Sequence, residues 1–395
     1  MSMDDEKLAR ELRGRADEVT GAPLGLDDVK HTASAIRRRR VATAVGAAAV
    51  VVALALPVGL TMVDRDSATS DPAPAAPDPD PTPNGPVAAR LTTDAPDGGA
   101  AETSYTWGDV VHEADGDEVR LPEVYDAFAP FGYGWLGVTY GENAGQLTVL
   151  DAEGSVVDTF LGGLGIAASG DGTLTAFSDA EGGIGTKGTA DSAVVELDPP
   201  GRPMKDVDVV AVVGSESCTR EEGCSVYFNE FGDLGGAYRI QENGKIWQYT
   251  LFSKLLGAAP DGRVAGLVSA SDDGSCSGVF DRAERRLWET CDYTLGAFSP
   301  DGTYVIGRPA YLDGVGDGLV AILDAETGEM VAEFSNDRRG QAFVRDAVWE
   351  TDRTLLATVF QQGEWGLMRM TDLGELEKVE DLGAGEDVDP PATLQ

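Results

Sequence analysis

Four cysteines are the side chains whose type and spacing most directly indicate chemistry. Cys218 and Cys224 can close a five-residue loop. A turn over residues 282–285 would place Cys276 opposite Cys291 on paired strands, within disulfide reach. Three connectivities are open to four cysteines, and this local geometry favours a bond within each close pair. A zinc site is disfavoured because 51 residues separate the two pairs and no histidine is near.

Histidine and serine offer little for nucleophilic catalysis. The chain has two histidines, and a Ser-His-Asp triad in the long C-terminal part would have to use His112, for which an ordinary strand-end role is the simpler interpretation. Residues 274–278 have the glycines of a nucleophile elbow, but Cys276 stands at their centre. Carboxylates are numerous, so a carboxylate-pair hydrolase stays open as an alternative, and no spacing singles out a pair. We predict no catalytic residue.

Calcium is the cofactor for which the sequence offers a weak candidate, at residues 115–118. Asp115 and Asp117 alternate as ligands in a calcium loop do, but Val119 stands where a third ligand is needed. Such residues more often form a solvated turn. We expect no bound cofactor, with calcium as the weaker alternative.

Short strands broken by glycine and aspartate turns fill residues 104–383, which is typical of an all-β domain. Within this region one turn recurs, most clearly as Ser299-Pro300-Asp301-Gly302 before a strand. The aspartates of its four copies lie 90, 40 and 51 residues apart, so the repeat is one unit of about 40–50 residues with one copy skipped. These repeat-turn aspartates are Asp171, Asp261, Asp301 and Asp352.

A second marker supports the same repeat. Six strands end in an acid followed by a polar turn, at Asp151, Asp198, Glu242, Asp281, Asp324 and Asp372. Each repeat then supplies four strands, which cannot bury both faces alone and must pack radially around an axis. The sequence therefore predicts a β-propeller of six four-stranded blades. A leading hairpin over residues 105–121 would either close the last blade or belong to a seventh.

The turns at Ser299-Pro300-Asp301-Gly302 and Ala259-Pro260-Asp261-Gly262 resemble those of WD40-like and TolB-type β-propeller repeats. The resemblance covers residues 129–383, although the Trp-Asp dipeptide of WD40 repeats is missing. The whole layout is similar to that of single-pass actinobacterial membrane proteins with an extracytoplasmic propeller. The resemblance implies a propeller held outside the cell by one anchor.

Residues 41–63 form an uncharged run of 23, preceded directly by Arg37, Arg38, Arg39 and Arg40. As a helix this run reaches ~34 Å, enough for a ~30 Å hydrocarbon core. It exceeds the ~7–15 apolar residues of a signal peptide, and a basic cluster tends to stay in the cytoplasm. We predict an uncleaved transmembrane anchor with residues 1–40 in the cytoplasm.

The remaining segments flank the propeller. Residues 64–103 contain seven alternating prolines between positions 72 and 86, which favour an extended, semi-rigid linker, and residues 384–395 would form an acidic tail. Residues 64–395 hold 21 basic and 60 acidic side chains. This charge excludes nucleic acids and anionic lipid surfaces as general partners.

These features together predict a membrane-anchored extracytoplasmic β-propeller that binds a protein or a glycan, or acts as a scaffold, at the cell surface. Two alternatives belong to other classes. One is a surface hydrolase with carboxylates in the propeller funnel. The other is a transmembrane signalling protein, similar to anti-sigma proteins, whose residues 1–40 hold a cytoplasmic partner.

Overall fold

The computed structural model describes residues 85–395, with short gaps at 141–144, 192, 198–203, 205, 220–222, 232–234, 272–273, 312–315, 337–341, 388–389 and 395. The expected cytoplasmic segment, the arginines 37–40, the anchor at 41–63 and most of the linker lie outside the described residues. Among those that are described, no helix is long and apolar enough to cross a membrane.

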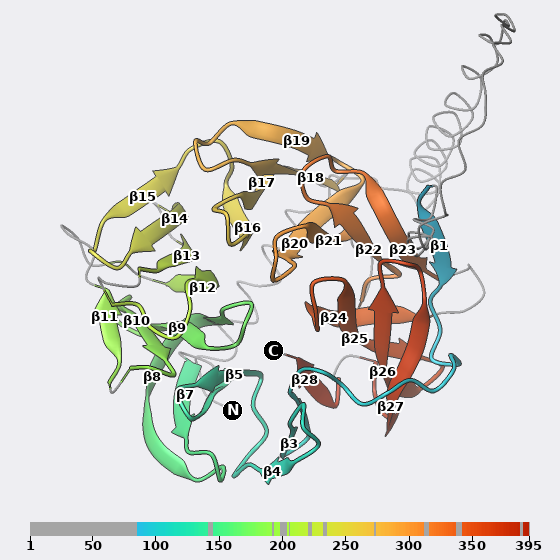
Figure 1. Cartoon of the computed structure of the whole chain (residues 1–395), viewed down its shortest axis with the longest axis horizontal. Coiled ribbons are helices and arrows are strands. Elements are labelled where there is room, and N and C mark those ends of the chain that lie inside the picture. Colours follow the sequence, from blue (N-terminus) through green and yellow to red (C-terminus); the bar gives the residue numbers. More distant parts are fainter. Residues whose placement is uncertain are drawn as a thin grey trace, which may run out of the picture. The chain divides into compact units, whose positions relative to one another are not determined.

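The regular elements of the described residues are strands, grouped in six hydrogen-bonded sheets. Figure 1 shows these sheets arranged radially around a common centre. The expected all-β propeller is therefore confirmed. Within each sheet neighbouring strands are antiparallel, except where β1 (Val87–Arg90) joins β23 in parallel.

Four sheets have four strands each. The first contains β28 (Ala392–Leu394), β2 (Tyr105–Trp107), β3 (Val110–His112) and β4 (Glu118–Arg120). The second contains β12 (Val207–Val213), β13 (Ser225–Glu230), β14 (Gly236–Gln241) and β15 (Ile246–Tyr249). The third contains β16 (Lys254–Ala258), β17 (Val264–Ser271), β18 (Gly274–Phe280) and β19 (Arg286–Thr290). The fourth contains β24 (Phe343–Trp349), β25 (Thr354–Gln361), β26 (Glu364–Thr371) and β27 (Leu376–Ala384).

The other two sheets are wider. The five-stranded sheet contains β20 (Tyr293–Phe298), β21 (Tyr304–Pro309), β22 (Leu319–Asp324) and β23 (Met330–Ser335), with β1 at its edge. The seven-stranded sheet contains β5 (Ala127–Phe131), β6 (Gly134–Tyr140), β7 (Gly145–Leu150), β8 (Val156–Ala168), β9 (Leu174–Asp179), β10 (Ile184–Gly188) and β11 (Val195–Leu197).

The predicted six or seven separate four-stranded blades are wrong. Five sheets form single blades of four or five strands, whereas the sheet β5–β11 is continuous and as wide as two blades. Its continuity comes from β8, whose first half pairs with β7 and whose second half pairs with β9. The register shifts between Gly162 and Ile166, where one partner replaces the other.

The core lies between neighbouring sheets. One cluster joins Ile306 and Ile322 of the five-stranded sheet to Val344, Leu355 and Met368 of the sheet β24–β27. All five side chains are at most 1% exposed. The sheets therefore stabilise one another face to face, as the radial packing of short repeats requires.

The two ends of the described chain enter the sheets. Leu394 of β28 pairs with Tyr105 of β2, so the leading hairpin forms a sheet with the C-terminal strand and does not join β24–β27. β1 lies within the expected linker at 64–103, and β28 lies within the expected acidic tail at 384–395. The structure differs from both expectations because these short segments each find an unpaired strand edge.

Candidate binding site in the central channel

Two adjoining cavities, of about 410 and 730 Å³, lie between the innermost strands of the sheets. Those strands are β28, β5, the second half of β8, β12, β16, β20 and β24. We call the two cavities together the central channel. Among the described residues its lining is apolar, acidic or uncharged polar, and no lysine, arginine or histidine contributes to it.

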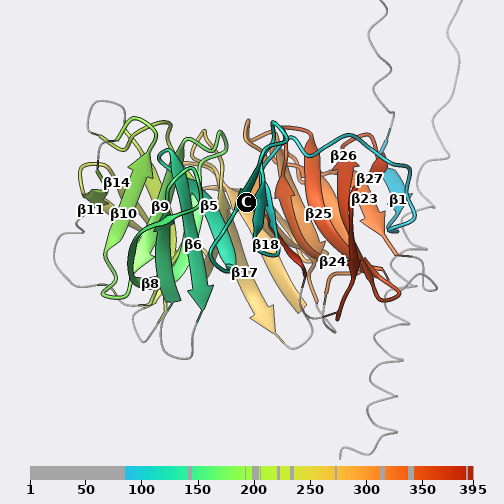
Figure 2. The same ribbon diagram turned by 90° about the horizontal axis from the view of Figure 1, so that it is seen from below.

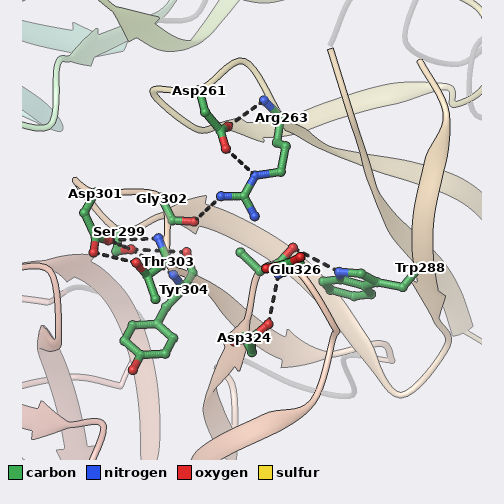
Figure 3. Close-up of polar contacts among 11 residues, drawn as sticks. Asp261, Arg263, Trp288, Ser299, Asp301, Gly302, Thr303, Tyr304, Asp324 and Glu326 are labelled. Carbon is green, nitrogen blue, oxygen red and sulfur yellow. Dashed lines mark hydrogen bonds and ion pairs between the residues drawn. The ribbon is translucent and has the colours of Figure 1, made fainter. Parts of the chain in front are cut away.

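The aspartates of two repeat turns stand at one mouth of the channel. In Asp301, Oδ1 accepts the Ser299 hydroxyl at 2.7 Å and the Thr303 backbone N–H at 2.9 Å (Figure 3). Asp171 accepts the same two bonds from Ser169 and Thr173. Burial raises the pKa of both carboxyls, but these hydrogen bonds outweigh it and leave each pKa below its usual value.

The other two repeat-turn aspartates help to connect neighbouring sheets. Asp261 binds Arg263 Nε at 2.7 Å, and the same guanidinium donates across to the Gly302 carbonyl at 2.7 Å (Figure 3). Asp352 Oδ1 accepts the backbone N–H of Asp301 at 2.9 Å. The four predicted turn residues thus form structural bonds, and the mouth that they surround is called the turn mouth below.

Another acidic residue of the channel lining, Glu350, forms a buried ion pair with Arg369. Arg369 Nε and Nη2 lie 2.6 and 2.8 Å from the two carboxylate oxygens of Glu350, whose side chain is 0% exposed. Arg369 also donates to the Ala100 carbonyl at 2.6 Å, and Glu350 accepts the Glu102 backbone N–H at 2.6 Å. This pair fastens the segment before β2 to the sheet β24–β27.

A carboxylate-pair hydrolase requires one carboxyl group that stays protonated near neutral pH. Burial raises the pKa of the carboxyls of Glu113, Asp208 and Asp317. None of these three lines the central channel. No described carboxyl with a raised pKa therefore stands where a substrate in the channel could meet it.

His112 lies in β3, outside the channel lining. Its ring stacks on Tyr105 with centroids 4.9 Å apart, and its Nδ1 lies 3.6 Å from Glu118 Oε1. At the candidate calcium turn, Asp115 Oδ1 accepts the Asp117 backbone N–H at 3.1 Å. This bond is that of an ordinary turn, and calcium binding there stays a prediction.

Both cysteine pairs expected from the sequence lie at disulfide distance. The Cα atoms are 5.0 Å apart for Cys218 and Cys224, and 4.1 Å apart for Cys276 and Cys291. The described residues contain one group with the spacing of metal ligands, Cys276, Glu289 and Cys291. Two of its three ligand atoms are the sulfurs of the disulfide, which leaves that group poorly suited to a metal.

Large apolar side chains are exposed at the end of the propeller opposite the turn mouth, where the innermost strands begin. Tyr140 ends β6, Phe231 follows β13 and Tyr311 follows β21, while Leu251 precedes β16 and Leu164 lies in β8. Figure 2 shows β6 and β17 running towards the same end. These five side chains, 42–50% exposed, are called the apolar rim.

Sequence reasoning missed the apolar rim. Four of its residues lie at or near strand ends, and Leu164 lies where β8 changes its pairing partner, so the alternation of buried and exposed side chains gives no signal at these positions. The available signal is a large apolar residue one or two positions after a strand, as at Phe231 and Tyr311.

Comparisons with known proteins find no matching family model and no matching curated protein. Among solved structures, TolB from Acinetobacter baumannii is 16% identical with a TM-score of 0.37, covering 60% of this chain and 63% of that one. BamB from Moraxella catarrhalis is 17% identical with a TM-score of 0.39, covering 74% and 83%. The C-terminal WD40 domain of Sif2 is 12% identical with a TM-score of 0.42, covering 68% and 80%. At these values the likeness is one of fold.

Proposed function

We propose that this protein is a binding or scaffold module whose apolar rim docks a partner protein. The rim carries the proposal, because five large apolar side chains are exposed at the same end of the propeller, where the innermost strands begin. Single exposed apolar residues are ordinary, but a group of them on one face marks an interaction surface. Tyrosine and phenylalanine are enriched at protein interfaces, where a few well-packed side chains supply most of the binding energy.

Contacts within the rim support a preformed surface. The Tyr140 hydroxyl donates to the Leu164 carbonyl at 3.1 Å, which joins β6 to β8. Lys254 Nζ lies 5.7 Å from the centre of the Phe231 ring, which joins the sheet β12–β15 to the next one. A partner therefore meets side chains that neighbouring strands and sheets already hold, and little ordering entropy opposes docking.

The test is capture of cross-linked partners by the tagged full-length chain in its native cells. The double variant Phe231→Ser, Leu251→Ser should lower the yield of a captured partner about tenfold, because two anchors are lost. Tyr133→Ser is the matched control, since Tyr133 is 84% exposed in the turn between β5 and β6, at the turn mouth. Equal yields from both variants at unchanged melting temperature would refute the rim as the docking surface.

The proposal also places the propeller outside the cell, held by a helix over residues 41–63 with the N-terminus in the cytoplasm. The uncharged run after Arg37–Arg40 and the two cysteine pairs support this placement. Protease added to intact protoplasts should remove a C-terminal tag and spare an N-terminal one. A protected C-terminal tag, exposed only after lysis, would contradict it.

A further inference from the structure

A third cavity, of about 470 Å³, shares no residue with the central channel. It lies between the outer strands β14 and β15, at the ring's edge in Figure 1, and the turn that joins β18 to β19. Its lining is unusual for so acidic a chain. It consists of Arg239, Gln241, Lys245, Trp247, Tyr249 and residues 282–284. We call it the basic cavity.

Strand pairing places two of these residues face to face. Arg239 of β14 is the direct partner of Trp247 of β15, so both side chains lie on the same side of the sheet. The Arg239 guanidinium carbon lies 5.4 Å from the centre of the Trp247 ring, and Lys245 Nζ lies 4.0 Å from it. The indole thus gathers two cations in one place by cation–π attraction.

Arg239 contributes an unsatisfied donor to this cavity. Its side chain is only 9% exposed, and its Nε is buried without a hydrogen-bond partner among the described residues. A buried donor on a charged group costs stability when it is left unsatisfied, and native structures contain few of them. An acceptor entering the cavity would complete this hydrogen bond.

The local charge favours an anion. Three cations, Arg239, Lys245 and Arg282, line the cavity with one acid, Glu284. No ion pair joins these cations to a residue that the structure describes. Two arginines close to Arg282 in the sequence are paired instead: Arg285 binds Asp281 and Arg286 binds Glu289.

The charges of these cations affect the pKa values of two buried tyrosines. Burial raises the pKa of the Tyr227 and Tyr249 hydroxyls, and Arg239 and Arg282 oppose this rise at both. Guanidinium groups from β14 and from the β18–β19 turn therefore act on the same small region, which sequence spacing alone would not bring together.

We propose that the basic cavity binds an oxyanion, namely the phosphate, sulfate or carboxylate group of a small ligand. The planar guanidinium of Arg239 can donate two parallel hydrogen bonds to such a group, and Lys245 and Arg282 add charge. The net charge of −38 repels an extended polyanion at long range, whereas a single anionic group is governed by the three nearby cations. A free anion and an acidic sugar share this chemistry.

The test is calorimetric titration of the full-length protein at low salt with sodium phosphate, sodium sulfate and sodium glucuronate, and with glucose as the uncharged probe. We expect saturable binding of at least one anion and none of glucose. Phosphate or sulfate binding identifies a tetrahedral anion, and glucuronate binding identifies a carboxylate sugar. No saturable binding of any anion would overturn the proposal.

Variants of two cavity cations and of one nearby arginine locate the site. Arg282→Gln should weaken binding about tenfold, the effect of losing one charge-assisted hydrogen bond, and Lys245→Gln should act in the same direction. Arg285→Gln is the matched control, because it removes the same charge from the same turn outside the cavity. Equal weakening by Arg285→Gln would show a diffuse charge effect and would also overturn the proposal. Both cavity variants are on exposed side chains, so loss of folding does not decide the result.

Discussion

Asp301 shows how one side chain can organise a turn. It accepts hydrogen bonds from the hydroxyl of Ser299 and from both the backbone and the hydroxyl of Thr303. The next residue, Gly302, has a φ of +77°, which glycine adopts without strain. The carboxylate and the glycine therefore explain why the turn repeats, without any catalytic role.

Replacing this carboxylate should destabilise the protein in a pH-dependent way. Asp301→Ala should lower the free energy of unfolding by about 1–2 kcal/mol at pH 7, from the hydrogen bonds lost. The pKa of Asp301 is lower in the folded state than in the unfolded chain. The stabilisation is therefore complete above the unfolded pKa and disappears as the pH falls through the folded one. Urea unfolding of the unchanged protein and of the variant gives the loss in free energy of unfolding at pH 7 and at pH 3.

Glu153→Ala serves as the control for this experiment, since the exposed Glu153 side chain has no described partner. It should leave the free energy of unfolding nearly unchanged at both pH values. If Asp301→Ala kept its full effect at pH 3, the carboxylate charge would not be the cause.

At the scale of elements, β8 determines how the widest sheet is built. Where β8 changes its pairing partner from β7 to β9, it also packs closely against β12 of the neighbouring sheet. A Cβ added to Gly165 would lie 2.6 Å from Val209 N and from Val209 O, both in the backbone of β12. Because backbone atoms cannot move aside cheaply, this position requires glycine.

Gly165→Ala should therefore lower the free energy of unfolding by at least about 2 kcal/mol. Gly296→Ala is the matched control in another innermost strand, β20. A Cβ there meets its nearest atom at 3.5 Å, an ordinary contact. Thermal unfolding of the two variants compares them directly. A Gly165→Ala protein as stable as Gly296→Ala would show that β12 shifts to make room.

The same elements show how far the sequence could predict the fold. The turn at Asp301 and the strand-ending acid Asp324 are local signals, and the structure has Asp301 in a turn and Asp324 at the end of β22. Gly163 and Gly165 look like a break between strands, and only the pairing of β8 with both neighbours reveals one long strand. The basic cavity joins Arg239 to Arg282, 43 positions apart in the sequence, through packing that no periodicity encodes.

At the scale of the whole propeller, ring closure depends on a strand of three residues. β28 pairs with β2, and the Thr393 hydroxyl donates to the Tyr125 carbonyl at 3.2 Å. Ala392 and Leu394 are 2% and 6% exposed, so they bury apolar surface in the same joint. A strand of three residues carries almost no sequence signal. Its position is seen only in the structure, where the C-terminal β28 pairs with β2 near the start of the propeller.

Deleting residues 392–395 should open this joint. The expected fall in melting temperature is about 5–10 °C, because a few kcal/mol of hydrogen bonding and burial are lost from a large domain. Hydrogen exchange distinguishes local opening from general damage. The amides of β2 should lose protection, while those of β17, in a sheet that β28 does not join, should keep it. Deleting Gln395 alone leaves β28 intact and should change neither measurement. Uniform loss of protection in both strands would mean that the ring unfolds as one unit, and unchanged protection of β2 would show that β28 does not hold the ring closed.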